Sequence, residues 1–285
     1  MKKILFATDL SANADRAMER AIQLTKRHDA QLYIVHVLPQ YKAKTLQDSL
    51  KQDTADLILE YFNKYRDAKG LSPKIEVLMG PTPHMQILDY AQKIKADMIV
   101  IGLHGKAKFR DLFVGTTVER LARKSTKPVL IVKDKSTGHY TSIVGTDEFA
   151  PASRAALRTA MELAPKGVFE IIHCFQIPVA YPTTAEFALA AYEQTEKTQN
   201  KAMDAFLKTE QTHFKKTHNG EAKRLGSRLV EGPAYQTLMK EAKTAKADLI
   251  TLGAHGASII TPFKLGGLAE DVLANPPCDI LLVRE

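Results

Sequence analysis

The sequence contains no tryptophan, only two cysteines and no long apolar run. Cys174 and Cys278 form no C-x-x-C pattern, which argues against a disulfide framework or a zinc cluster and favours a reducing compartment, the cytoplasm. No stretch approaches the roughly 18 consecutive apolar residues that a membrane helix needs. Asp9 also cuts short the apolar start, so we read that start as a strand and not as a signal peptide. We therefore expect no membrane association.

The net charge of +8 is distributed unevenly along the chain. Residues 1–137 hold 24 Lys and Arg against 15 Asp and Glu, whereas residues 138–285 hold 16 against 17. A basic half attracts any polyanion, nucleic acid included. Aromatic residues are not interleaved with the basic ones, however, and no nucleic-acid recognition motif is present. A small phosphorylated ligand in the first half is the better explanation, and nucleic acid the weaker one.

An internal repeat organises the chain. Residues 96–105, ADMIVIGLHG, return 151 residues later as residues 247–256, ADLITLGAHG. Thr8 and Asp9 return as Thr146 and Asp147. At 285 residues the chain is long enough for two domains, each with its own core. We therefore predict domains at 1–137 and 138–285, joined by a short linker over residues 135–139.

Apolar runs alternate with helical patterns in both halves, which predicts parallel sheets with helices on both faces. Expected strands in the first half are residues 3–8, 31–38, 74–78, 97–101 and 128–132, with helices from Ala14, over 46–69 and over 83–95. Expected strands in the second half are residues 142–146, 168–175, 224–230, 248–252 and 280–283, with helices over 152–163, 185–217 and 234–245. Ligands of such folds bind at the carboxyl ends of the strands, where the strand order reverses.

The stretch 102–117 has the spacing G-x2-G-x9-G-T between a predicted strand and a predicted helix. Glycines let the backbone approach a ligand, and the amides and positive dipole end of the helix favour a phosphate. Thr116 and Thr117 add hydroxyl donors, and the loop adds the cations Lys106, Lys108 and Arg110. Gly102, Gly105 and Gly115 could instead be turn residues of a loop that binds nothing.

This spacing resembles the nucleotide loop of the universal stress protein family, and the likeness covers both halves of the chain. It implies two tandem Rossmann-like domains, each a five-stranded parallel sheet of order 3-2-1-4-5, paired as an intrachain pseudo-dimer along their fifth strands. It also implies an adenine nucleotide, ATP or else ADP or AMP, with a divalent ion such as Mg²⁺ held mainly by the phosphates. Whether two chains form a homodimer is left open. The residues that the resemblance assigns to the nucleotide are Thr8, Asp9, Val37, Ile101, Gly102, Gly105, Gly115, Thr116 and Thr117. Asp9 could instead serve only as the N-cap of the following helix.

The second glycine loop departs from this pattern. Gly253, Gly256 and Gly266 keep the spacing, but Gly267 and Leu268 replace the two threonines. Residues 253–278 hold one basic and two acidic residues, against seven and two in residues 102–127. We therefore expect one strong nucleotide site, in the first half. The apolar loop over residues 257–264 either forms a surface for a partner or a hydrophobic ligand, or packs against the other domain.

Three functions follow from these observations. The first is a cytoplasmic nucleotide-binding stress or regulatory protein without a dedicated reaction. The second is a slow ATPase or adenylate-forming enzyme, for which Asp111 and Glu119 are the candidate water-positioning groups. The third, nucleic-acid binding, rests on charge alone. The repeated histidines, His36 with His173 and His104 with His255, lack neighbours at metal-ligand spacing, so we interpret them as structural.

Overall fold

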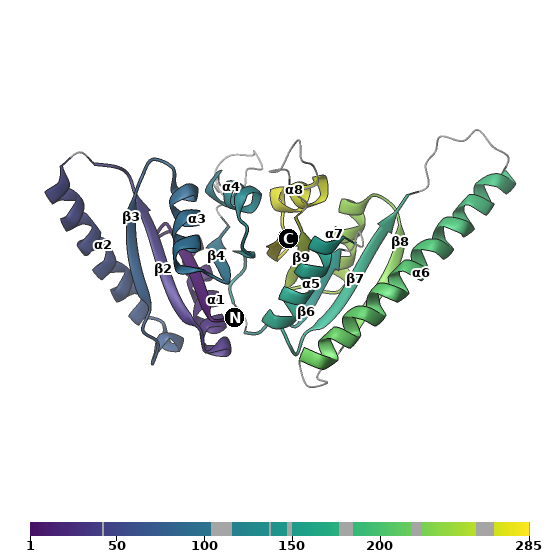
Figure 1. Cartoon of the computed structure of the whole chain (residues 1–285), viewed down its shortest axis with the longest axis horizontal. Helices are drawn as coiled ribbons and strands as arrows, with labels where there is room; N and C mark the ends of the chain where they lie inside the picture. The colour runs from purple at the N-terminus through teal and green to yellow at the C-terminus, as the bar shows by residue number, and fades with distance from the viewer. Residues whose placement is uncertain are drawn as a thin grey trace.

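The computed structural model describes residues 1–41, 43–103, 116–136, 138–146, 150–176, 185–217, 224–254 and 265–284. Strands and helices alternate in both halves (Figure 1). The first half contains β1 (Lys3–Thr8), α1 (Ala12–His28), β2 (Gln31–Leu38), α2 (Lys44–Asn63), the 3-10 helix η1 (Arg66–Ala68), β3 (Lys74–Met79), α3 (Pro83–Ile94), β4 (Met98–Gly102), α4 (Thr116–Lys124) and β5 (Val129–Val132). The second half contains β6 (Ser142–Thr146), α5 (Pro151–Leu163), β7 (Val168–Phe175), α6 (Ala185–Thr217), β8 (Arg224–Glu231), α7 (Ala234–Thr244), β9 (Leu249–Gly253), α8 (Gly267–Ala274) and β10 (Asp279–Val283).

The strands form one ten-stranded sheet of order β3-β2-β1-β4-β5-β10-β9-β6-β7-β8. Each half therefore has the strand order 3-2-1-4-5, and its strands are parallel, which confirms the predicted fold class. The halves meet along their fifth strands, where β5 pairs antiparallel with β10 and Leu130 lies opposite Leu281. The strand order reverses between β1 and β4, and again between β6 and β9.

Two apolar cores cover the two faces of this sheet. Alternate residues of each strand point to opposite faces, so Ile4 and Phe6 lie in one core and Leu5 and Ala7 in the other. The first core is closed by α1, α2, α5 and α6, and the second by α3, α4, α7 and α8. In Figure 1, α2 and α6 lie at the two outer ends of the molecule, and α4 and α8 are neighbours in the middle. Burial on both faces explains why the strands read as continuous apolar runs.

The predicted elements agree with the structure except at some ends, and the largest error concerns α2. A helix over residues 46–69 was expected, but α2 ends at Asn63 and η1 follows it. Tyr65 adopts an extended backbone between the two helices and packs against the first core. The helical spacing of buried residues continues past this turn, since Ala68 is buried as Ile58 and Phe62 are. The pattern therefore could not show where the helix breaks.

The largest difference between the halves is α6, which has 33 residues against 20 in α2. Its fully buried Glu210 accepts hydrogen bonds from Arg154 at 2.7 Å and from Arg158 at 2.7 and 3.0 Å, both on α5. This paired carboxylate holds the long helix against its own half. Among the residues that the structure describes, no helix is long and apolar enough to cross a membrane.

Candidate functional site

The candidate site lies where β1 and β4 run side by side and the strand order reverses. Ala7 pairs with Ile101, so Thr8, the last residue of β1, ends close to Gly102, the last residue of β4. The chain leaves β1 towards one end of the sheet and returns to β4 on the other side. Such a reversal leaves a crevice at the carboxyl edge that the connecting helices do not fill. The structure thus brings together the two strand ends that the sequence assigned to one ligand.

The turn after β1 is held by its own side chains. The Leu10 amide donates to the Thr8 Oγ1 at 3.0 Å, and the Ser11 amide donates to the Asp9 Oδ1 at 3.1 Å. Leu10 has a φ of 62°, in the left-handed region that residues with a Cβ seldom adopt. Ser11 is the N-cap of α1, since its Oγ accepts from the Ala14 amide at 3.3 Å. The alternative that Asp9 is the helix N-cap is therefore wrong, because its carboxylate shapes the turn before the helix and is exposed at the sheet edge.

The other strand residues of the predicted set lie along the same edge. Val37 is half-buried near the end of β2 and pairs with Leu78 of β3. Ile101 is buried in the second core, so it can offer a ligand mainly its backbone and the apolar floor. Gly102 pairs with Val132 of β5 at the last position of β4. These residues place apolar side chains and glycine backbone along this edge, and a nucleobase site needs such groups.

The helix expected to face a phosphate begins at Thr116, and Thr117 lies half-buried in its first turn. The unpaired amides and positive dipole end of α4 lie at this end of the helix. Gly105 and Gly115, with the cations between them, fall outside the described residues. The described residues therefore include the two strand ends and the helix start of the predicted site. The predicted loop between β4 and α4 lies outside the described residues.

Sequence reasoning missed His84, which starts the helix next to α4. It is 4% exposed and follows Pro83 at the start of α3. Burial lowers the pKa of His84, and the nearby Lys124 and Arg120 lower it further, so the imidazole is neutral at physiological pH. A single histidine without a ligand motif gives no signal in the sequence.

The repeated histidines that the structure describes lie inside strands. His36 Nδ1 lies 2.8 Å from the carbonyl oxygen of Thr8, across the β1–β2 pair. His173 is buried in β7. His104 and His255 fall outside the described residues. Within the described ranges, no group of three or more His, Cys, Asp or Glu side chains could hold a metal ion.

The second half uses the equivalent positions differently. A Cβ added to Gly253 would lie 2.5 Å from the backbone nitrogen of Ser153 and 2.6 Å from the carbonyl carbon of Ala152. The start of α5 thus packs directly on the end of β9, which requires a glycine whether or not a phosphate binds. Helix α8 begins after Gly266 and has no side-chain cap.

The acidic first turn of α8 is paired with the helix of the first half. Glu270 accepts from Arg123 NH1 at 2.7 Å, and Arg123 also donates to Glu119 on its own helix at 2.9 and 3.1 Å. These carboxylates hold the pKa of Arg123 above its usual value, although its burial acts in the opposite direction. The N-terminus of α8, where a phosphate would lie, therefore carries the Glu270 carboxylate, which is already paired with Arg123. No local pattern in the sequence predicts this bridge, because the two residues lie 147 positions apart.

Together these features define a tandem α/β protein in which each half is a doubly wound parallel sheet with a strand-order reversal at its ligand edge. The chain belongs to the universal stress protein family, whose model matches residues 1–133 and again residues 140–284. The predicted resemblance is therefore confirmed, in both halves.

Individual relatives agree with this assignment. The chain is 31% identical over 140 residues to "Universal stress protein MJ0531" of Methanocaldococcus jannaschii, covering 46% of this chain and 82% of the relative. It is 26% identical over 158 residues to "Universal stress protein MJ0577" of the same organism, covering 48% and 97%. A crystal structure of a universal stress protein from Archaeoglobus fulgidus has a TM-score of 0.68 at 19% identity, covering 99% of this chain and 98% of that one. At that identity the structure supports the fold, including the tandem arrangement, and nothing more.

Proposed function

We propose that the first half binds ATP, or else ADP or AMP, and that the chain is a cytoplasmic stress-response module regulated by this nucleotide. The observation that carries the proposal is the convergence of the ends of β1 and β4 at the strand-order reversal, together with the basic excess of this half. The relatives are named for stress and not for a reaction. A binding module is the function that fits this combination.

Each part of the edge has a role in this proposal. The Asp9 carboxylate accepts hydrogen bonds from the ribose hydroxyls, and the half-buried Val37 contacts the base. The phosphates lie against the start of α4, where amides and the Thr117 hydroxyl donate to them. A divalent ion such as Mg²⁺ would be held mainly by the phosphates, which suits a set of described residues without a metal-ligand cluster. The remaining residues proposed to contact the nucleotide are Thr8, Ile101, Gly102, Gly105, Gly115 and Thr116.

The enzyme alternative loses one of its two candidate groups. Glu119 accepts two hydrogen bonds from Arg123, which direct the carboxylate along its own helix. A carboxylate used in this way is a poor choice for activating water. Asp111 falls outside the described residues.

The proposal is tested by calorimetric titration of the full chain with ATP and Mg²⁺. We expect one equivalent of ATP per chain. The Asp9→Asn variant keeps an acceptor for the Ser11 amide but loses the charge, so its affinity should fall by about 10- to 100-fold, the effect of losing hydrogen bonds to a charged group. The matched variant Asp147→Asn, at the repeated position, should bind like the wild type. Two equal equivalents, or no loss in Asp9→Asn, would refute the proposal.

A further inference from the structure

Helix α1 carries a polar stripe that lies along the junction between the halves. Its members are Arg16, Arg20, Gln23 and Arg27, at spacings of four, three and four residues that place them on one face of the helix. Arg16 NH1 donates to the carbonyl oxygen of Lys133 at 2.7 Å. Gln23 Oε1 accepts from Ser136 Oγ at 2.6 Å. Arg27 NH1 donates to the carbonyl oxygen at residue 163, the end of α5, at 2.8 Å. The predicted linker is therefore fastened to α1.

Arg20 is the centre of this stripe and is only 5% exposed. Its guanidinium carbon lies 3.9 Å from the centroid of the Tyr140 ring, a cation–π contact. Its NH1 donates to the carbonyl oxygen of Gly138 at 2.5 Å, and its Nε lies 3.6 Å from Asp279 Oδ2. One side chain of the first half thus contacts both the linker and the second half.

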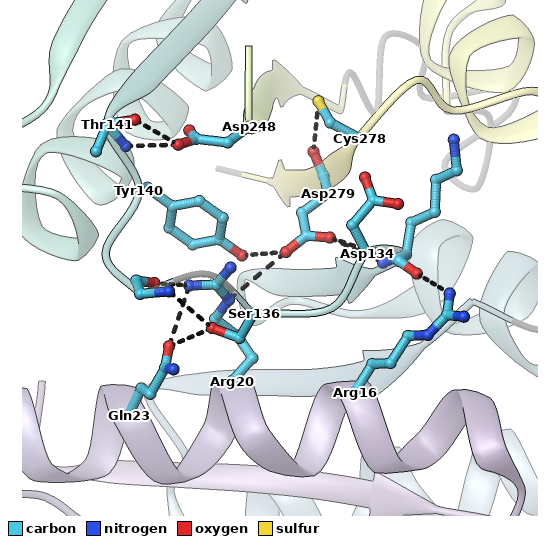
Figure 2. A network of polar contacts seen from close by, with 12 residues as sticks. Arg16, Arg20, Gln23, Asp134, Ser136, Tyr140, Thr141, Asp248, Cys278 and Asp279 are labelled. Atoms are coloured by element: carbon cyan, nitrogen blue, oxygen red, sulfur yellow. Dashed lines mark hydrogen bonds and ion pairs between the residues drawn. The ribbon is translucent and has the colours of Figure 1, made fainter. Parts of the chain in front are cut away.

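Asp279, on β10, collects the other bonds of the junction (Figure 2). It is 1% exposed and accepts from the Tyr140 hydroxyl at 2.6 Å and from the amides of Lys133 and Asp134 at 2.8 and 3.1 Å. Burial raises the pKa of Asp279, and these donors together with Arg20 act in the opposite direction. A buried carboxylate with three hydrogen-bond donors and one ion-pair partner holds its neighbours in one arrangement, because losing a donor leaves part of a buried charge unsatisfied.

The junction contacts of Arg16 and Arg20 differ from those of the equivalent helix of the second half. Helices α1 and α5 align through their buried faces, Ala17, Met18, Ala21 and Ile22 against Ala156, Leu157, Ala160 and Met161. In this alignment by burial Ala155 and Thr159 occupy the positions of Arg16 and Arg20, whereas the Thr8–Asp9 repeat, one residue out of step with it, places Arg154 and Arg158 there. Thr159 bonds only within its own helix, to the carbonyl oxygen of Ala155 at 2.8 Å. Arg154 and Arg158 bond to Glu210 of their own half, whereas Arg16 and Arg20 bond to Lys133 and Gly138 at the junction, so the difference lies in the partners and not in the residue type.

The same helix begins at the candidate nucleotide site. Its N-cap, Ser11, is bonded to Asp9, and its side chains reach the junction from the second turn onward. A helix of 17 residues moves as a unit, so a ligand that changes the turn at its start shifts the side chains along its length. We propose that α1 transmits occupancy of the nucleotide site to the junction between the halves, with Arg20 as the positioning residue. This rests on the proposed function and specifies how the nucleotide would regulate the chain.

The test combines calorimetry with hydrogen exchange followed by mass spectrometry on the full chain. The amides of Lys133 and Asp134, which bond to Asp279, report the junction directly. Saturating ATP with Mg²⁺ should slow exchange over residues 133–141 by about fivefold in the wild type, a coupling of ordinary size. In Arg20→Met, which keeps the stem and loses the donors, this slowing should disappear. Lys26→Met, a substitution on the same helix outside the stripe, should retain it.

The outcomes separate the coupling from the binding. If calorimetry shows ATP binding but exchange in the wild type does not slow, the coupling is overturned and the proposed function stands. The same conclusion follows if exchange in Arg20→Met slows as much as in the wild type. If no nucleotide binds, both fail. Should Arg20→Met not fold, Arg16→Met removes only the contact to Lys133 and is expected to reduce the slowing, and unreduced slowing there would overturn the coupling as well.

Discussion

The packing of Gly253 predicts that a single methyl group there destabilises the second half. In Gly253→Ala the added Cβ would lie 2.5 Å from the backbone nitrogen of Ser153, 2.6 Å from the carbonyl carbon of Ala152 and 2.9 Å from the Ser153 Cα. All three are backbone atoms of α5, so no side-chain rotation can relieve the contact. The start of α5 must retreat from β9, which also strains the bond from Thr251 Oγ1 to the carbonyl oxygen of Ala156 at 3.1 Å.

Overpacking of this kind costs about 1–3 kcal/mol. In a unit of about 150 residues each kcal/mol lowers the melting temperature by roughly 2–4 °C. The unfolding transition of the second half should therefore move down by several degrees in scanning calorimetry. ATP binding in the first half should not change, because Gly253 lies in the other half.

The matched control is Gly267→Ala, in the same glycine pattern. A Cβ there meets nothing within 4 Å, and the residue lies in the first turn of α8 without a positive φ. This variant should melt with the wild type or slightly above it, since alanine restricts the unfolded chain. Equal melting of Gly253→Ala and the wild type, or an equal loss in Gly267→Ala, would refute the reasoning that helix packing requires a glycine at 253.

Two further predictions concern buried charge. Glu210→Gln leaves the two arginines of α5 facing a neutral amide. We therefore expect the free energy of unfolding in urea to fall by about 1–3 kcal/mol and amide exchange in α6 to become faster. Unchanged exchange would contradict this prediction. Burial, the N-terminal ammonium and Arg27 lower the pKa of His28 to about 4. Because protons then bind the unfolded chain more tightly, the stabilisation is complete above about pH 6.5 and is lost as the pH falls towards 4. Because the ring is only partly buried, solvent screening reduces the expected effect to about 1–2 kcal/mol. His28→Asn should flatten this part of the urea-unfolding profile against pH, and an unchanged slope would contradict the prediction.

Local patterns in the sequence determined the elements and their order. Apolar runs bounded by turn residues marked each strand, and the 151-residue repeat showed that the two halves share one fold. The same patterns indicated the edge at which β1 and β4 end side by side, because the carboxyl ends of parallel strands lie at the same edge of a sheet. The end of α2 was missed, since helical periodicity does not record a break in the backbone at Tyr65.

The junction between the halves was decided only by tertiary structure. No spacing in the sequence relates Arg20 to Asp279, or Arg123 to Glu270, since each pair comes from different halves and is joined only when β5 meets β10. The sequence indicated only a short linker over residues 135–139, and the tertiary structure showed that hydrogen bonds to α1 hold it in place. Secondary structure follows from neighbours a few residues apart, which the sequence displays. Contacts between distant segments depend on where whole elements pack, and this position is set by the complete fold.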